Sequence, residues 1–227
     1  MFEGLLNLFF PKSCPGCHSF LLSDEIVICT SCRHEIPLTN HHKTINNETF
    51  QKFYGKLPVE FASSLFYFHK KGIVQEMIHK LKYKGHEEIG ETIGNWYAED
   101  LKLLEHFATI DLIIPVPLHK KKFRERGYNQ VTKFGEALSK GLEIPYNDGI
   151  LVRNVYSKTQ TRKNLLGRTA VIENIFDVAF SETHHNKHFL LIDDVITTGS
   201  TLEACGRALL KIPGAKISIV SMAMTHQ

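Results

Sequence analysis

The chain has 227 residues, of which 43% are hydrophobic and 22% are charged, and its formal net charge is +3. This length predicts one α/β core with a small appendage, and the composition excludes a disordered or fibrous protein. The net charge is too small to indicate a nucleic-acid partner by itself, and no apolar run reaches the roughly 18 residues of a membrane-spanning helix.

Residues 1–13 open the chain with an apolar pattern that predicts a short amphipathic helix ending at Pro11. Glu3 and the short length of the segment argue against a signal peptide. We expect this helix to pack on the module that follows it, and peripheral contact with the inner membrane is the alternative. The predicted location is therefore the cytoplasm.

Four of the five cysteines form two Cys-x-x-Cys pairs separated by eleven residues, Cys14 with Cys17 and Cys29 with Cys32. Each pair makes a tight turn that directs two thiolates to one point, so the two pairs predict a tetrahedral zinc site. Disulfide bonds are the alternative, but nothing in the sequence indicates export. Because four cysteines leave no open coordination position, we expect a structural zinc. The fifth cysteine, Cys205, is expected in the core.

The sequence divides into two parts. The zinc-ribbon-like module at residues 12–38 is too small to fold on a core alone, and residues 39–58 are polar and predict an irregular linker. We therefore assign residues 1–58 to the N-terminal helix, the zinc module and the linker. Residues 59–227 form the main domain.

The main domain alternates predicted strands with predicted helices. Strands are expected near residues 64–68, 112–117, 149–152, 177–180, 189–192 and 217–224, and helices near 73–81, 89–104, 129–142 and from about 200 onward. This alternation predicts an α/β fold with a doubly wound, mostly parallel sheet.

A basic segment follows the strand predicted at 112–117, with five basic residues among the seven from Lys120 to Arg126. The carboxyl end of a parallel strand lies on the ligand side of the sheet, so a basic loop there could hold a pyrophosphate group. A solvated charged face is the alternative. The candidates are His119 and Lys120 for pyrophosphate and Lys121, Lys122, Arg124 and Arg126 for nucleic acid, with Phe123 and Tyr128 expected to be exposed beside them.

The stretch from Phe189 to Thr201 combines a buried strand, two acids, a hydroxyl-rich loop and the start of a helix. Four apolar residues precede Asp193 and Asp194, which are expected where the strand ends. The loop from Thr197 to Thr201 surrounds Gly199 with hydroxyl groups, and a helix N-terminus attracts phosphate. The acids would repel that phosphate, but they suit the hydroxyl groups of a ribose. A ribose with a 5-phosphate would therefore satisfy both halves of the stretch.

The structural alternative for this stretch is a pair of solvated acids followed by a serine that caps a helix. A P-loop is excluded because the chain has no Gly-Lys-Ser/Thr. The thirteen residues resemble the phosphoribosyl-pyrophosphate (PRPP) motif of the type I phosphoribosyltransferases, in which Thr-x-Gly-x-Thr follows the acids after two further residues. This resemblance implies that PRPP is bound by Asp193, Asp194, Thr197, Thr198, Gly199, Ser200 and Thr201.

Several further segments resemble the competence protein F family. They are the two Cys-x-x-Cys pairs, residues 115–119 with the basic run after them, residues 126–130, Gln160-Thr161 and Arg168. One departure is Val171, which stands where that family usually has Asn. The resemblance covers nearly the whole chain and implies a phosphoribosyltransferase-like fold with a link to DNA uptake.

The resemblance implies displacement of pyrophosphate at C1 of the sugar, with magnesium bridging the pyrophosphate and ribose oxygens. Asp193 and Asp194 would be catalytic by orienting the ribose and metal-bound water, and a lid would be formed by Arg162, Lys163 and Arg168. No segment identifies the acceptor. We therefore expect either a phosphoribosyltransferase or a non-catalytic PRPP-fold protein that binds single-stranded DNA, with competence proteins as partners.

Overall fold

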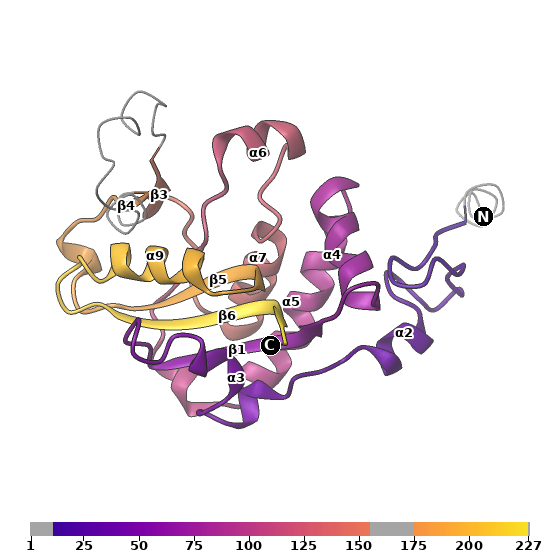
Figure 1. Ribbon diagram of the computed structural model, residues 1–227, viewed down its shortest axis with the longest axis horizontal. Helices are drawn as coiled ribbons and strands as arrows, with labels where there is room; N and C mark the ends of the chain where they lie inside the picture. The colour runs from indigo at the N-terminus through magenta and orange to yellow at the C-terminus, as the bar shows by residue number, and fades with distance from the viewer. Residues whose placement is uncertain (1–10, 155–174, 227) are drawn as a thin grey trace.

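The computed structural model describes residues 11–154 and 175–226, which are organised around a four-stranded sheet in the order β1-β6-β5-β2 (Figure 1). The strands are β1 (Phe61–Phe68), β2 (Leu112–Pro115), β5 (His188–Ile196) and β6 (Lys216–Thr225). All three pairings are parallel. The predicted parallel α/β core is therefore confirmed.

Helices cover both faces of the sheet, because alternate residues of each strand point to opposite sides. In β5, Leu190 and Ile192 pack with the helices of one face, while Phe189 and Leu191 pack with those of the other. The first face is covered by α4 (Ile73–Tyr83), α5 (Glu88–Leu101) and α7 (Thr132–Leu142). On the second face, α9 (Ser200–Leu209) lies along β5 and β6 (Figure 1).

The strand-like runs predicted at 149–152 and 177–180 form a separate antiparallel pair. The two strands are β3 (Leu151–Arg153) and β4 (Phe176–Val178), and they pair with each other rather than with the main sheet. Leu151 and Phe176 are buried and join the core beneath α9. The pair therefore extends the cover of the second face. Short 3-10 helices, η2 (Glu105–Thr109) and η3 (Glu182–His184), complete the connections.

Residues 39–58 differ from the prediction of an irregular linker. They contain η1 (His41–Lys43) and α3 (Glu48–Gln51), and Phe53 and Leu57 are buried in the core. The segment is polar because its side chains satisfy buried backbone groups; Asn47 Nδ2, for example, donates to Ala62 O of β1 at 2.8 Å. The polar composition thus reflects buried hydrogen bonding rather than solvent exposure.

Of the predicted N-terminal helix at residues 1–13, residues 1–10 lie outside the part of the chain that the structure describes. Within the described part, no helix has the length and apolar character needed to cross a membrane. The small module that follows contains one helix, α2 (Thr30–Glu35).

The contact between α5 and α7 provides a test of the packing. A Cβ atom added to Gly94 would lie 2.7 Å from both Ala137 Cβ and Phe134 O. We expect Gly94→Ala to lower the free energy of unfolding by about 1–3 kcal/mol because the helices must move apart. Gly90→Ala on the same helix is the matched control, since its nearest neighbour would be Phe134 N at 3.4 Å.

Urea unfolding of both variants measures this difference. Gly90→Ala should be neutral or stabilising, because alanine forms helices better than glycine by about 1 kcal/mol. Equal stability of the two variants would contradict the close approach of α5 and α7.

Candidate functional site

The sequence predicted that the two acids of the central stretch would lie where the strand ends. They lie inside β5 instead. β6 continues beside them, with Asp193 opposite Ser221 and Val195 opposite Ala223. On the other side, β2 ends at Pro115, opposite Ile192. The strand therefore carries its acids past the end of β2, and beyond Ile192 no strand of the described residues pairs with that edge of β5.

The hydroxyl-rich loop follows directly and leads into α9. Gly199 has a φ of 81°, a left-handed conformation that side chains other than glycine rarely adopt, and α9 starts at Ser200. Thr198 Oγ1 lies 2.9 Å from Ser200 Oγ, and Thr197, Thr198, Ser200 and Thr201 are all exposed. An exposed set of hydroxyls at the N-terminus of a ten-residue helix is suited to a phosphate group.

The acid pair is electrostatically strained. Asp194 is 5% exposed and forms an ion pair with Lys82, whose Nζ lies 2.8 Å from Asp194 Oδ2. Burial, and then the neighbouring charge of Asp194, raise the pKa of Asp193 well above its usual range, while Lys82 and Lys122 act in the opposite direction. The charge of Asp194 therefore reaches Asp193, and carboxylate oxygens are donors of the kind that magnesium takes.

Lys82 is a member of the site that the sequence analysis missed. It lies in the last turn of α4, and its spacing from the helix's apolar residues resembles that of an ordinary solvated lysine. Only the position of α4 relative to β5 brings its ammonium group to Asp194. No local sequence signal could have identified this contact.

The basic segment after β2 forms a helix, α6 (Lys120–Arg126), rather than the predicted loop. Its sequence is rich in good helix formers and is bounded by His119, whose Nδ1 accepts from Lys121 N at 3.1 Å, and by Gly127 with a φ of 82°. Lys120, the favoured pyrophosphate ligand, is exposed. Lys122 is the residue of α6 whose charge lowers the pKa of Asp193.

The predicted nucleic-acid residues of α6 differ in accessibility. Lys121, Lys122 and Arg124 are exposed, and Phe123 is 50% exposed as expected. Arg126 instead stacks over Tyr83 at 4.9 Å and donates to Gln130 Oε1 at 2.6 Å. Tyr128 was predicted to be exposed, but it is half-buried and donates a hydrogen bond to Leu81 O. These contacts join the C-terminal end of α6 to α4.

The predicted lid residues, Arg162, Lys163 and Arg168, lie outside the described residues.

The four cysteines of the N-terminal module meet as predicted, with all their sulfur atoms within 4.8 Å of one another. None of the five cysteines forms a disulfide. Backbone N–H groups of Gly16, Cys29 and Cys32 point to sulfur atoms at 3.4 Å, which stabilises thiolates. Burial raises the pKa of the Cys29 and Cys32 thiols, and a divalent cation would offset that effect. The cluster could therefore hold a metal such as zinc.

The cysteine cluster is packed against the main domain. Cys14, Cys29 and Cys32 are buried in the same core cluster as α4 and α5. Lys80 Nζ of α4 donates to Cys14 O at 3.4 Å, and Arg33 of α2 stacks over Trp96 of α5 at 4.9 Å. The module therefore shares α4 with the acid pair.

Comparison with known proteins finds relatives whose names refer to competence and DNA use. The chain is 30% identical over 151 residues to competence protein F of Haemophilus influenzae, covering 65% of this chain and 66% of that protein. It is 25% identical over 222 residues to competence protein ComFC of Bacillus subtilis, covering 90% of this chain and 86% of that protein. The "DNA utilization protein YhgH" of Escherichia coli K12 is 26% identical over 154 residues, covering 66% of each chain.

The chain thus spans about two thirds of the length of the first curated relatives that it matches. No family model matches it. Among solved structures, a purine phosphoribosyltransferase from Pyrococcus horikoshii aligns with 60% of this chain and 73% of its own, at 20% identity and a TM-score of 0.39. Adenine phosphoribosyltransferase from Leishmania tarentolae aligns with 80% of this chain and 89% of its own, at 14% identity and a TM-score of 0.37.

The cysteine cluster yields a direct prediction about metal. Cys29→Ser should lower the bound zinc from about one per chain to near zero, because one of four ligands is lost and the other thiols are buried. Metal analysis of the purified protein measures this, and limited proteolysis should show faster cleavage within residues 12–38. Cys205→Ala is the control, since Cys205 is buried outside the cluster and its loss should leave the zinc content unchanged. Full zinc occupancy in Cys29→Ser would refute the assignment.

Proposed function

The chain belongs to the competence protein F family, and on this premise we propose that it binds PRPP with magnesium and transfers phosphoribose to an acceptor. The proposal depends on one observation. Asp193 and Asp194 lie at a free edge of β5, directly beside an exposed hydroxyl-rich loop at the N-terminus of α9.

In this proposal each part of PRPP has its own partners. The 5-phosphate binds the loop from Thr197 to Thr201, because hydroxyl and backbone N–H groups donate to a dianion. The ribose hydroxyls donate to Asp193 and Asp194. Lys122, with Lys120 and His119 beside it on α6, neutralises the pyrophosphate group as it leaves C1.

Magnesium would supply charge neutralisation between the pyrophosphate and the acid pair. Without a ligand, Lys82 neutralises part of the charge of the acid pair, because its ammonium group forms an ion pair with Asp194. The zinc proposed for the cysteine cluster takes no part in the chemistry, because four thiolates leave it no open position.

Calorimetry with PRPP and magnesium tests the binding site. The double variant Asp193→Asn and Asp194→Asn keeps the shape of the side chains but places NH₂ donors where acceptors are needed. We expect it to bind PRPP at least about a hundredfold more weakly. Circular dichroism must show that the variant is folded, because Asp194→Asn also removes the ion-pair partner of Lys82.

The matched control is Asp24→Asn with Asp148→Asn, which removes two charges from exposed positions and should not change the affinity. Substitution of Gly199 is a poor test, because its φ of 81° and the Phe53 ring 3.2 Å from an added Cβ would strain any variant. Unchanged affinity in the double variant would show that the stretch is a structural strand–turn–helix. Release of pyrophosphate from PRPP across a panel of bases then separates a transferase from a binding protein.

A second candidate function is binding of single-stranded DNA during uptake. It is supported by the exposed face of α6, where Lys121, Lys122 and Arg124 surround Phe123, and by the names of the relatives. Cations would bind the phosphates, and the exposed ring could stack on a base.

We expect weak DNA binding whose affinity falls steeply as salt rises, because phosphate contacts release counterions. Replacing Lys121, Lys122 and Arg124 by Ala should flatten the slope of log affinity against log salt by about two to three. The control replaces Lys43, Lys70 and Lys140, three exposed lysines outside α6. Fluorescence anisotropy with a labelled oligonucleotide provides both slopes, and equal slopes in the two variants would exclude α6 as the DNA site.

A further inference from the structure

A pocket of about 590 Å³ adjoins the hydroxyl-rich loop on the side of residues 46–56. Its lining includes Glu48, Gln51, Lys52, Lys56, Thr198 and His226. Thr198 belongs to the proposed phosphate loop, so the pocket and that loop share a wall. The remaining walls come from α3, the turn after it and the end of β6, none of which the sequence analysis assigned to a site.

Lys52 is the unusual residue of this pocket. Its side chain lines the pocket although the residue is only 9% exposed. Among the described residues, the ammonium group of Lys52 forms no ion pair and no hydrogen bond. Burial lowers the pKa of Lys52, the charge of Glu48 acts in the opposite direction, and the nearby Lys56 lowers the pKa further. The stem of Lys52 is therefore buried while its ammonium group opens onto the pocket, where an anion would stabilise the charge.

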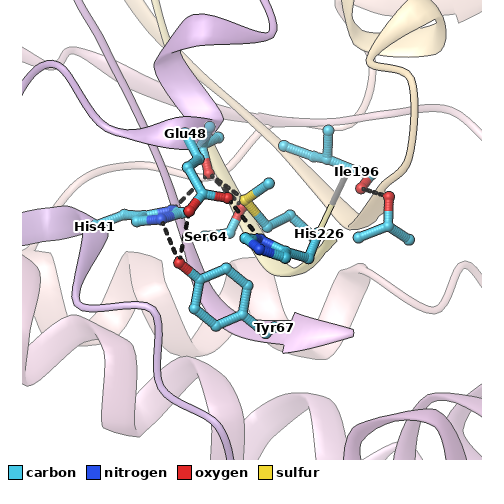
Figure 2. Close-up of polar contacts among 9 residues, drawn as sticks. His41, Glu48, Ser64, Tyr67, Ile196 and His226 are labelled. Atoms are coloured by element: carbon cyan, nitrogen blue, oxygen red, sulfur yellow. Dashed lines mark hydrogen bonds and ion pairs between the residues drawn. The ribbon is translucent and has the colours of Figure 1, made fainter. Parts of the chain in front are cut away.

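The acid in the pocket, Glu48, acts on Lys52 through its charge but forms no hydrogen bond or ion pair with it. Glu48 Oε1 accepts from Tyr67 OH at 3.0 Å, and Glu48 Oε2 lies 3.0 Å from His226 Nδ1 (Figure 2). Both carboxylate oxygens are therefore engaged by partners other than Lys52. Glu48 keeps its negative charge, but the pocket lining carries two lysines, Lys52 and Lys56, against this one acid, so the pocket is net positive.

A buried hydrogen-bond network holds this wall in place. His41 Nδ1 lies 2.9 Å from Thr49 Oγ1, which in turn lies 2.9 Å from Ser64 Oγ of β1 (Figure 2). Ser64 Oγ lies 2.7 Å from Ser221 Oγ of β6. The network ties residues 41–49 to the two strands beneath them, so the pocket is formed before any ligand arrives.

Lys52 is also held directly against the loop. A Cβ atom on Gly199 would lie 3.2 Å from Phe53 Cε1 and 3.9 Å from Lys52 Cβ. The segment that carries Lys52 therefore packs on the one position of the loop that must be glycine. Lys52 and Thr198 therefore line the same pocket from neighbouring segments.

We propose that this pocket binds a phosphate group, held by Lys52 with the hydroxyl of Thr198 and with Lys56 at the rim. The phosphate is either the 5-phosphate of PRPP, in which case the inference deepens the proposed function, or the phosphate of a second small molecule bound beside it. Both sources present the same dianion to Lys52.

Titration of the 227-residue protein with inorganic phosphate, followed by NMR, tests the site without PRPP. Lys52→Met keeps the aliphatic stem and its packing but removes the charge. We expect it to weaken phosphate binding at least about tenfold, since hydrogen bonds to charged groups are strong. Thr198→Val should weaken it less. Lys43→Met removes an exposed lysine from the same segment and should have no effect.

Competition identifies the source of the phosphate. If ribose 5-phosphate displaces the bound phosphate, the pocket holds the 5-phosphate of PRPP; if both bind together, it holds a second ligand. The double variant of Asp193 and Asp194 should keep its phosphate affinity, so failure of the PRPP proposal at the acids would leave this result standing. Phosphate binding that is absent from the unmodified protein, or equal in Lys52→Met, would overturn the inference.

Discussion

The parallel pairing of β5 with β6 beyond the end of β2 is the constraint on which the site depends. It carries Asp193 and Asp194 to an edge that no third strand among residues 11–154 and 175–226 covers, yet leaves Asp194 buried. Two adjacent carboxylates in such surroundings are unfavourable, as the raised pKa of Asp193 records. Proteins tolerate this free-energy cost at functional sites, because repulsion between the carboxylates favours the binding of a cation or of hydrogen-bond donors.

The elements around the acids supply the opposing charge. Lys82 arrives from α4 and Lys122 from α6, so two helices that follow different strands meet over one strand end. α4 has a second role, because it also contacts the cysteine cluster through Lys80, two residues from Lys82. Packing of the cysteine module and placement of the Lys82 ammonium group at the acids therefore depend on the same turn of α4.

Residues 39–58 show how a polar segment can belong to a core. Their hydrogen bonds to β1 and β6 replace solvent, and Phe53 and Leu57 complete the apolar layer under α9. The same packing buries Lys52 beside Gly199. Among the lysines of this segment, Lys52 is the one whose side chain is buried, which makes it the most informative feature of the segment.

The sequence by itself determined the features that depend on neighbouring residues. The order of buried strand, acids, hydroxyl-rich loop and helix could be predicted from Phe189 to Thr201, and the glycine at 199 has the left-handed backbone that the loop requires. The Cys-x-x-Cys spacing likewise predicted the cluster of four sulfur atoms. Strand and helix periodicity predicted the parallel sheet, because alternation within each element is local.

Only the tertiary structure decided which distant groups meet. The length of β5 depended on β6 continuing beside it, and the helix at 120–126 depended on its caps and on Arg126 and Tyr128 binding to α4. Lys82 and Lys52 have ordinary sequence surroundings, and their importance follows from burial against Asp194 and Gly199. The energy of a charge depends on the dielectric and the charges around it, and those are set by the folded neighbours rather than by the sequence on either side.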